Sequence, residues 1–358
     1  MSVLDQQRPI FSESDAIRIV RDIYGLEGSV KEFPSYKDRN YYFQTTSGEE
    51  YVLKITETSE PREILELQNA VMNHLERKNI AFSCPSVVET IDGEEITYVD
   101  DCDGTPHMVR LLTFVPGIVF AEVNPHSPDI IYDLGSALGT LSLALDDFSN
   151  PVADMTALWD MKNASSTIRQ YKHVIEDPTS AGLIEYYLKM FEEDVVPKLD
   201  SLRTSVIHSD ANDYNILVSN SSYPDRREFG LIDYGDTMTS YTVFEIAIAA
   251  AYLILDKPDP IAAAAHLIRG YHEKFPLTEI ELDLLFCMMC TRLATSICIS
   301  THQFKKEPDN EYIVISVERA NIILEKLRKI NPKYATNVFR VACGLPPYPN
   351  IVKVLNDI

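Results

Sequence analysis

Residues 206–218 read VIHSDANDYNILV, and this is the most informative stretch of the sequence. His208 and Asp210 stand two positions apart, and Asn215 follows Asp210 after four intervening residues. The apolar residues at both ends predict short strands, so the polar residues between them should lie on a loop where strands end. The stretch therefore predicts a set of polar groups that a β-structure holds in one place.

A second stretch, FGLIDYGD at residues 229–236, also places a polar residue, Asp233, directly after an apolar run. Phosphoryl transfer to a hydroxyl needs a carboxylate that accepts the hydroxyl proton, and hard oxygen ligands that hold Mg²⁺. We therefore predict that Asp210 is the catalytic base and that Asn215 and Asp233 are the metal ligands.

A more ordinary interpretation is a loop in which Asp and Asn make local turn hydrogen bonds. The spacing of Asn215 from Asp210, the flanking strands and the second stretch favour the catalytic interpretation. His208 could act as a general base, but in this loop we expect it to make structural hydrogen bonds that hold Asp210.

The composition is that of a globular protein, with 358 residues, 45% of them apolar and 24% charged. This length suggests two domains or one domain with two lobes. The net charge of -22 argues against nucleic acid as a partner. The excess of acidic residues serves solubility, or part of the negative charge attracts a cationic substrate.

Neither a signal peptide nor a membrane span is expected. Residues 1–5 show no basic region before an apolar run, and no run of about 18 uncharged apolar residues occurs. The six cysteines lack a compact disulfide spacing, so a reduced, cytoplasmic protein is expected. Cys287 and Cys290 lie in an apolar helical pattern, which favours core packing over metal or redox chemistry.

The chain changes character near residue 116. Before that point, strand-like runs and helical patterns alternate, at 12–24 (helix), 40–46, 51–55, 61–78 (helix), 87–91 and 107–115. Asp92 and Gly93 are expected to form the turn between the last two strands. After residue 118, helical patterns dominate, at 129–146, 180–200, 243–255, 259–274, 278–301 and 309–329. This segregation predicts an α+β fold with a β-rich N-terminal lobe (1–115) and a larger, mostly helical C-terminal lobe (116–358).

The His208-x-Asp210-x4-Asn215 spacing, followed by IDYG at 232–235, resembles the aminoglycoside phosphotransferase and choline kinase superfamily. Protein kinases share the plan but usually carry Arg where Ser209 stands. Four segments narrow the resemblance to the hydroxylysine kinase subfamily: SYKDRNY (35–41), VRLLTFVPG (109–117), FGLIDYGD (229–236) and VFEIAI (243–248). The resemblance spans roughly residues 12–329 and implies a bilobal, protein-kinase-like small-molecule kinase.

The resemblance also implies Mg²⁺ and a nucleoside triphosphate donor, either ATP or GTP. Lys54 would contact the α- and β-phosphates, although a lysine on an edge strand could instead point to solvent. Ser35 and Asn40 would cover the phosphates in place of a glycine-rich loop, or belong to a solvated hairpin turn. The backbone around Leu112 and Phe114 would form the hinge that binds the nucleobase.

Kinases usually pair the lysine with a helix glutamate. In this sequence the matching position is Gln68, whereas Glu66 points about 200° away from the apolar stripe of the same helix. The partner of Lys54 is therefore open between Gln68 and Glu66.

On the acceptor side, the resemblance implies a small hydroxylated amine or amino acid, with hydroxylysine favoured. Its ammonium group should meet acidic side chains, and the candidates are Asp213, Asp236 and Glu245. Glu245 has a rival role, because superfamily members often carry Asp there to brace the catalytic loop. Arg292, on an otherwise apolar helix, would bind a substrate carboxylate or pair with a structural carboxylate.

Rival functions stay open at this point. Kinases for an aminoglycoside, choline or homoserine would use the same catalytic residues. A catalytically inactive nucleotide-binding module is conceivable because Gln68 departs from the kinase pattern. A metal-dependent hydrolase would need histidine ligands beyond His208, and none stands at a suitable spacing. The sequence does not decide the oligomeric state.

Overall fold

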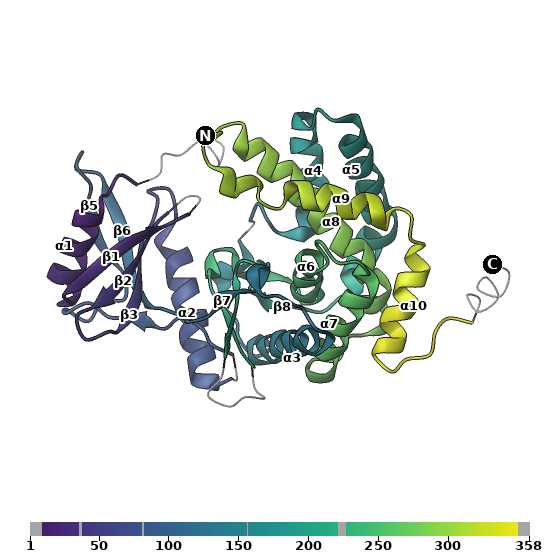
Figure 1. Ribbon diagram of the computed structural model, residues 1–358, viewed down its shortest axis with the longest axis horizontal. Coiled ribbons are helices and arrows are strands. Elements are labelled where there is room, and N and C mark those ends of the chain that lie inside the picture. Colours follow the sequence, from purple (N-terminus) through teal and green to yellow (C-terminus); the bar gives the residue numbers. More distant parts are fainter. Residues whose placement is uncertain (1–8, 36–37, 81, 156, 221–226, 350–358) are drawn as a thin grey trace. The chain divides into compact units, whose positions relative to one another are not determined.

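The computed structural model describes residues 9–35, 38–80, 82–155, 157–220 and 227–349. They form two compact units, one up to Pro116 and the other from Gly117 onwards, with Ile80 and Phe82 grouped with the second. Figure 1 shows both units and labels many of their helices and strands. Residues 1–8, which include the stretch read for a signal peptide, lie outside the described residues.

An antiparallel sheet forms the centre of the first unit. Its strands run in the order β1-β2-β3-β6-β4, and β5 also pairs with β6. The strands are β1 (Gly28–Phe33), β2 (Arg39–Thr45), β3 (Glu50–Ile55), β4 (Val87–Val88), β5 (Thr97–Asp100) and β6 (Pro106–Thr113). Three expected strands are confirmed as β2, β3 and β6. The expected turn at Asp92 and Gly93 is present, but it leads into β5, a strand that the sequence pattern did not reveal.

Two helices complete this unit, α1 (Glu13–Tyr24) and α2 (Arg62–Lys78). Ser12 and Asp15 form a capping box at the start of α1, and Gly25 ends it with a left-handed φ of 68°. The buried face of α1 shares one apolar core with β2, β3 and β6. This core holds the sheet that carries the predicted donor residues.

The second unit is mostly helical, as expected. Its α-helices are α3 (Pro128–Leu145), α4 (Ala164–Tyr171), α5 (Pro178–Met190), α6 (Val243–Leu253), α7 (Pro260–Lys274), α8 (Glu279–Phe304), α9 (Val317–Leu327) and α10 (Pro332–Ala342). The sequence patterns did not reveal α4 or α10. The helix expected at 180–200 is α-helical only up to residue 190. A π-helical turn follows at Phe191–Val195 and a 3₁₀ turn at Val196–Ser201.

Glycines let α3 and α7 approach closely. A Cβ atom added to Gly270 would lie 2.0 Å from the carbonyl oxygen of Tyr132, and one added to Gly135 would lie 2.0 Å from that of Leu267. Only a residue without a side chain permits this backbone contact. The two helices are therefore locked side by side.

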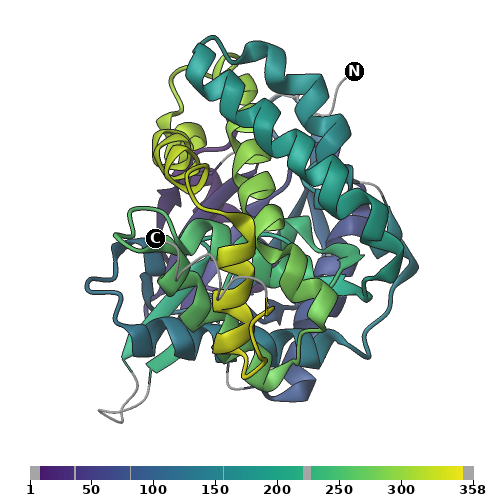
Figure 2. The same cartoon turned by 90° about the vertical axis from the view of Figure 1, so that its right-hand side faces the viewer.

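Helix α8 forms the centre of this helical array, where it packs against α4, α5, α6, α9 and α10 (Figure 2). By length and composition alone it could cross a membrane, yet 94% of its apolar window is buried inside the structure. Cys287 and Cys290 are buried on it as free thiols. A core position accounts for the apolar character of α8.

Short strands in the second unit position the loops that carry His208, Asp210, Asn215 and Asp233. Strand β8 (Thr204–Ile207) pairs with β11 (Met238–Tyr241), while β9 (Ile216–Asn220) pairs with β10 (Arg227–Leu231) and β7 (Ile118–Val119). All three pairings are antiparallel. The loop between β8 and β9 carries residues 208–215 and is called the catalytic loop below.

Candidate active site

The start of the catalytic loop is fixed by a buried carboxylate. Oε2 of Glu245 on α6 accepts hydrogen bonds from the backbone N–H groups of His208 (2.7 Å) and Ser209 (3.2 Å). Ser209 has a left-handed φ of 67°, an uncommon conformation for serine. Burial raises the pKa of Glu245 to about 7, although both N–H donors counteract this effect. Glu245 thus has the geometry of a brace.

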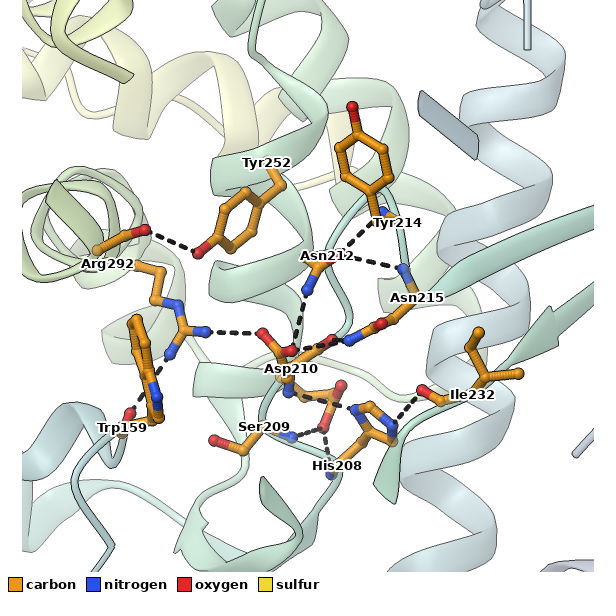
Figure 3. Close-up of polar contacts among 12 residues, drawn as sticks. Trp159, His208, Ser209, Asp210, Asn212, Tyr214, Asn215, Ile232, Tyr252 and Arg292 are labelled. Carbon is orange, nitrogen blue, oxygen red and sulfur yellow. Dashed lines mark hydrogen bonds and ion pairs between the residues drawn. The ribbon is translucent and has the colours of Figure 1, made fainter. Parts of the chain in front are cut away.

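His208 connects the loop to the neighbouring strand (Figure 3). Its Nδ1 accepts from the N–H of Asp210 at 3.2 Å, and its Nε2 lies 3.1 Å from the carbonyl oxygen of Ile232. Nε2 must therefore carry the proton. Burial lowers the pKa of His208 to about 4, which keeps the ring neutral. This geometry is that of a structural cross-link rather than a general base.

Asp210 is held from both sides of its carboxylate. Oδ2 accepts from the side-chain amides of Asn212 (2.9 Å) and Asn215 (2.7 Å), and Oδ1 accepts from Nη2 of Arg292 (2.8 Å). Burial raises the pKa of Asp210 to about 7, an effect that Arg292 opposes and the charge of Asp236 reinforces. With 20% of its side chain exposed, the carboxylate can still meet a ligand.

Arg292 comes from α8 and is buried between two aromatic rings. Its Cζ lies 4.9 Å from the centroid of Trp159 and 5.7 Å from that of Tyr252, and Nη1 donates to the carbonyl oxygen of Trp159 at 3.3 Å. The sequence left its partner open between a substrate carboxylate and a structural one. The structure pairs Arg292 with a carboxylate of the chain, that of Asp210, which is also the predicted base.

Asn215 and Asp233 come together through the strand pair β9–β10. Leu231 is opposite Ile216, and the N–H of Ile232 bonds the carbonyl oxygen of Asn215 at 3.0 Å, so Asp233 follows directly beside Asn215. The charge of Asp233 contributes to raising the pKa of Asp210, after burial and the charge of Asp236.

The donor set fits a magnesium ion. The amide nitrogen of Asn215 donates hydrogen bonds to the carbonyl oxygen (2.9 Å) and to Oδ2 of Asp210. The amide oxygen of Asn215 therefore points away from Asp210 and can accept a contact from a metal. Asp233 is exposed, with a left-handed φ of 64°. Over the described residues no group of three His, Cys, Asp or Glu side chains could hold a metal. Mg²⁺ suits such a sparse site, because it takes one or two protein ligands together with phosphates and water. The hydrolase alternative needed more histidines than these residues offer.

The other acidic candidates lie nearby. Asp213 is buried in the catalytic loop, where its Oδ2 lies 3.4 Å from Nη1 of Arg319. Asp236 ends a short 3₁₀ turn, and its charge acts on both Asp210 and Arg292. Sequence reasoning did not single out Arg319, whose position near the start of α9 gave no signal.

In the first unit, three polar residues form one row across the sheet. Asn40 on β2 is opposite Lys54 on β3, and Lys54 is opposite Arg110 on β6. Cross-strand neighbours share a face, so Arg110 lies next to the two predicted phosphate contacts, with its buried guanidinium bonded to Asn69 and Gln68. Sequence reasoning missed this, because the row depends on the pairing of strands far apart in the chain.

The expected partners of Lys54 bind other cations. Gln68 accepts from Nη2 of Arg110 at 2.6 Å, and Glu66 pairs with Arg62 on the surface of α2 at 2.8 Å. Gln68 thus contacts Arg110 and Glu66 contacts Arg62 of its own helix, and the partner of Lys54 stays open between the two.

The remaining donor candidates are placed as follows. The hydroxyl of Ser35 donates to the carbonyl oxygen of Asp38, while Tyr36 and Lys37 lie outside the described residues. Leu112 is paired within the sheet with both β3 and β4. The N–H of Phe114 bonds Glu50 at 3.0 Å, so this N–H is not free to bind a nucleobase.

Comparison with known proteins identifies the family of the chain. The model of the family described as "Phosphotransferase enzyme family" matches residues 29–281. The mouse protein named hydroxylysine kinase is 30% identical over 354 residues, which cover 93% of each chain. These findings confirm the resemblance of the motif to phosphotransferases.

Two solved structures share the fold. A microcompartment-associated aminopropanol kinase has a TM-score of 0.69 at 17% identity and covers 88% of this chain and 98% of its own. The amicoumacin kinase hAmiN, solved with AMP-PNP, Ca²⁺ and Ami, has a TM-score of 0.66 at 15% identity, with 88% and 94% covered. The expected kinase-like α+β fold is confirmed. The chain is therefore a small-molecule kinase that belongs to the phosphotransferase enzyme family.

Proposed function

We propose that the protein transfers the γ-phosphoryl group of ATP or GTP to a side-chain hydroxyl of a small amine or amino acid, with hydroxylysine as the favoured acceptor. The observation that carries this proposal is the position of Asp210, whose two carboxylate oxygens are fixed by Asn212, Asn215 and Arg292. The mouse relative named hydroxylysine kinase supports the choice of acceptor.

Asp210 would act on the acceptor directly. The acceptor hydroxyl donates its proton to the Asp210 carboxylate while its oxygen forms a bond to the γ-phosphorus. The bond between that phosphorus and the bridging oxygen breaks, and the nucleoside diphosphate leaves with the bridging oxygen. A base works best when its pKa is near the working pH, and the pKa of Asp210 is raised to about 7.

The remaining residues would bind and orient the reactants. Asn215 and Asp233 are the proposed ligands of Mg²⁺, which when bound neutralises negative charge on the phosphates. Lys54 and Asn40, neighbours on β3 and β2, are proposed to contact the donor phosphates. Glu245 and His208 would hold the catalytic loop in shape through the hydrogen bonds to its backbone.

A cytoplasmic location is part of this proposal. All six cysteines are free thiols in the structure, which suits a reducing compartment.

The test is phosphate transfer from Mg-ATP and from Mg-GTP to hydroxylysine, homoserine, choline, aminopropanol and an aminoglycoside. We expect turnover with hydroxylysine at the highest kcat/KM, and loss of turnover by about 10²-fold or more in Asp210→Asn. Asp309→Asn, which changes an exposed carboxylate, is the matched control and should keep full activity.

Two outcomes would contradict the proposal. Faster transfer to another acceptor in the panel would replace hydroxylysine and keep the kinase. Tight nucleotide binding without transfer to any acceptor, in wild type and Asp210→Asn alike, would favour the inactive nucleotide-binding module.

A further inference from the structure

Four charged side chains gather beside the catalytic loop, and they are called the charged cluster below. Asp213 belongs to the loop, Asp256 and Lys257 follow the end of α6, and Arg319 lies near the start of α9. Arg319 Nη1 lies 3.4 Å from Asp213 Oδ2 and 3.3 Å from Asp256 Oδ2. All four residues belong to the second unit.

Arg319 is held more loosely than two other arginines of this unit. Arg203 reaches Glu281 at 2.6 Å, and Arg292 reaches Asp210 at 2.8 Å. Strong hydrogen bonds between charged groups measure about 2.7–2.9 Å. The two contacts of Arg319 exceed that range, so its guanidinium group is shared between two carboxylates without a close bond to either.

Asp213 retains an unused acceptor. The residue is only 6% exposed and its Oδ2 faces Arg319, yet no described residue donates a hydrogen bond to its Oδ1. A buried carboxylate oxygen that lacks a donor costs free energy. A ligand with a cationic N–H donor would remove that cost.

Lys257 is bound to a neutral partner. Its Nζ lies 2.7 Å from Nδ1 of His126, and Nε2 of the same ring lies 2.8 Å from the carbonyl oxygen of Phe120. Nε2 therefore carries the ring proton and Nδ1 accepts from the ammonium group. Burial lowers the pKa of His126, with Lys257 adding to the effect, so the ring stays neutral. No described carboxylate forms an ion pair with Lys257, whose charge can therefore meet an anion.

We propose that the charged cluster binds the α-amino-acid head group of the acceptor. Arg319 and Lys257 would bind the α-carboxylate, and Asp213 and Asp256 would bind the α-ammonium group. This inference rests on the proposed function and narrows its acceptor to free α-amino acids that carry a hydroxyl on the side chain.

The charge balance of the cluster selects this class of ligand. Two carboxylates and two cations match a zwitterion, which brings one charge of each sign. A polycationic aminoglycoside would leave Arg319 and Lys257 facing positive groups, and choline brings no anion for them. Asp213 follows Asp210 by three residues, so the two positions are at most about 11 Å apart. A side chain of a few carbons can span that distance from head group to hydroxyl.

The test compares two acceptors that differ only in the α-carboxylate, 5-hydroxy-L-lysine and 1,5-diamino-2-pentanol. We expect Arg319→Met to raise KM for hydroxylysine about 10-fold or more while kcat changes less than about 3-fold. KM for the diamine should stay within about 2-fold of wild type. Arg319→Lys should restore part of the affinity, and Arg269→Met, on the exposed face of α7, is the matched control.

An equal effect of Arg319→Met on both acceptors would overturn the head-group site, because a cation that binds the carboxylate acts only where a carboxylate exists. So would an unchanged KM for hydroxylysine. If wild type phosphorylates neither acceptor, the proposed function fails by itself. Calorimetric titration with hydroxylysine then tests the head-group site separately. Saturable binding that Arg319→Met abolishes would keep the site, and absence of binding to wild type would overturn it.

Discussion

Nη2 of Arg292 lies 2.8 Å from Oδ1 of Asp210, although the two residues are 82 positions apart in the chain. The guanidinium group is buried between the rings of Trp159 and Tyr252, so it has little freedom to turn away. Arg292 therefore fixes one oxygen of the proposed catalytic carboxylate, while Asn212 and Asn215 fix the other. We infer that Arg292 positions the proposed base.

Replacement of Arg292 should show whether this residue positions the Asp210 carboxylate or only contributes to packing. We expect Arg292→Met to lower kcat by about 10²-fold or more, and Arg292→Lys to lower it less, because lysine keeps the charge without the planar fork. Arg292 also lowers the pKa of Asp210, so in Arg292→Met the acidic limb of the pH–rate profile should move to higher pH. Steady-state kinetics between pH 5.5 and 9 measure both effects. A lower kcat with an unmoved acidic limb would mean that Arg292 serves packing alone.

Glu245 should make stability depend on pH. Its pKa is raised to about 7 in the folded chain, so its contribution to stability is complete below its ordinary pKa and is lost as pH rises through 7. Glu245→Gln does not titrate and keeps an acceptor for the two backbone N–H groups. Relative to this variant, wild type should lose stability from pH 5.5 to about 7, by up to about 1.4 kcal/mol per pH unit, and the difference should level off between pH 7 and 8.5.

Urea denaturation of both proteins across that range measures the difference. The titration of His208, whose pKa is lowered to about 4, affects both proteins and cancels in the comparison. A difference that does not vary with pH would show that Glu245 keeps an ordinary pKa.

Much of the site could be predicted because its residues are close in sequence. Asp210 and Asn215 share one loop, and Asp233 follows β10, the second strand after that loop, so spacing and alternation were sufficient to group them. Arg292 stood out as a charge in an apolar helix, but its partner did not, because helix packing decides which side chain it meets. Nothing local indicated Arg319 or Lys257, which have the appearance of ordinary surface charges.

The same limit applies to the first unit. The pattern of β2 and β3 was readable, yet the row formed by Asn40, Lys54 and Arg110 depends on register across β2, β3 and β6. Gln68 was correctly noticed as an anomaly on α2, and its role followed only when Arg110 was found beside it. Strand β1 carries few strong strand formers, so its place at the sheet edge comes from pairing with β2.

The contact between α3 and α7 offers a direct test of packing. Gly270→Ala would place a Cβ atom 2.0 Å from the carbonyl oxygen of Tyr132, so the helices must move apart. We expect a loss of about 1–3 kcal/mol in the free energy of unfolding, measured by urea denaturation. Gly182→Ala in α5 is the matched control, because nothing lies within 4 Å of the added atom. It should stabilise the protein by about 0.5–1 kcal/mol, and equal effects of both changes would contradict the packing argument.

Asp233 should govern the dependence of activity on magnesium. Asp233→Asn removes a charged oxygen ligand but keeps the size of the side chain, so the Mg²⁺ concentration for half-maximal activity should rise about 10-fold or more. Asp309→Asn, with an exposed carboxylate elsewhere in the same unit, should leave it unchanged. The measurement is initial rate against free Mg²⁺ at saturating donor and acceptor, after removal of metal with EDTA. If Asp233→Asn lowers kcat at every Mg²⁺ concentration with the same midpoint as wild type, Asp233 is not a ligand, and its charge then acts on the reaction through Asp210.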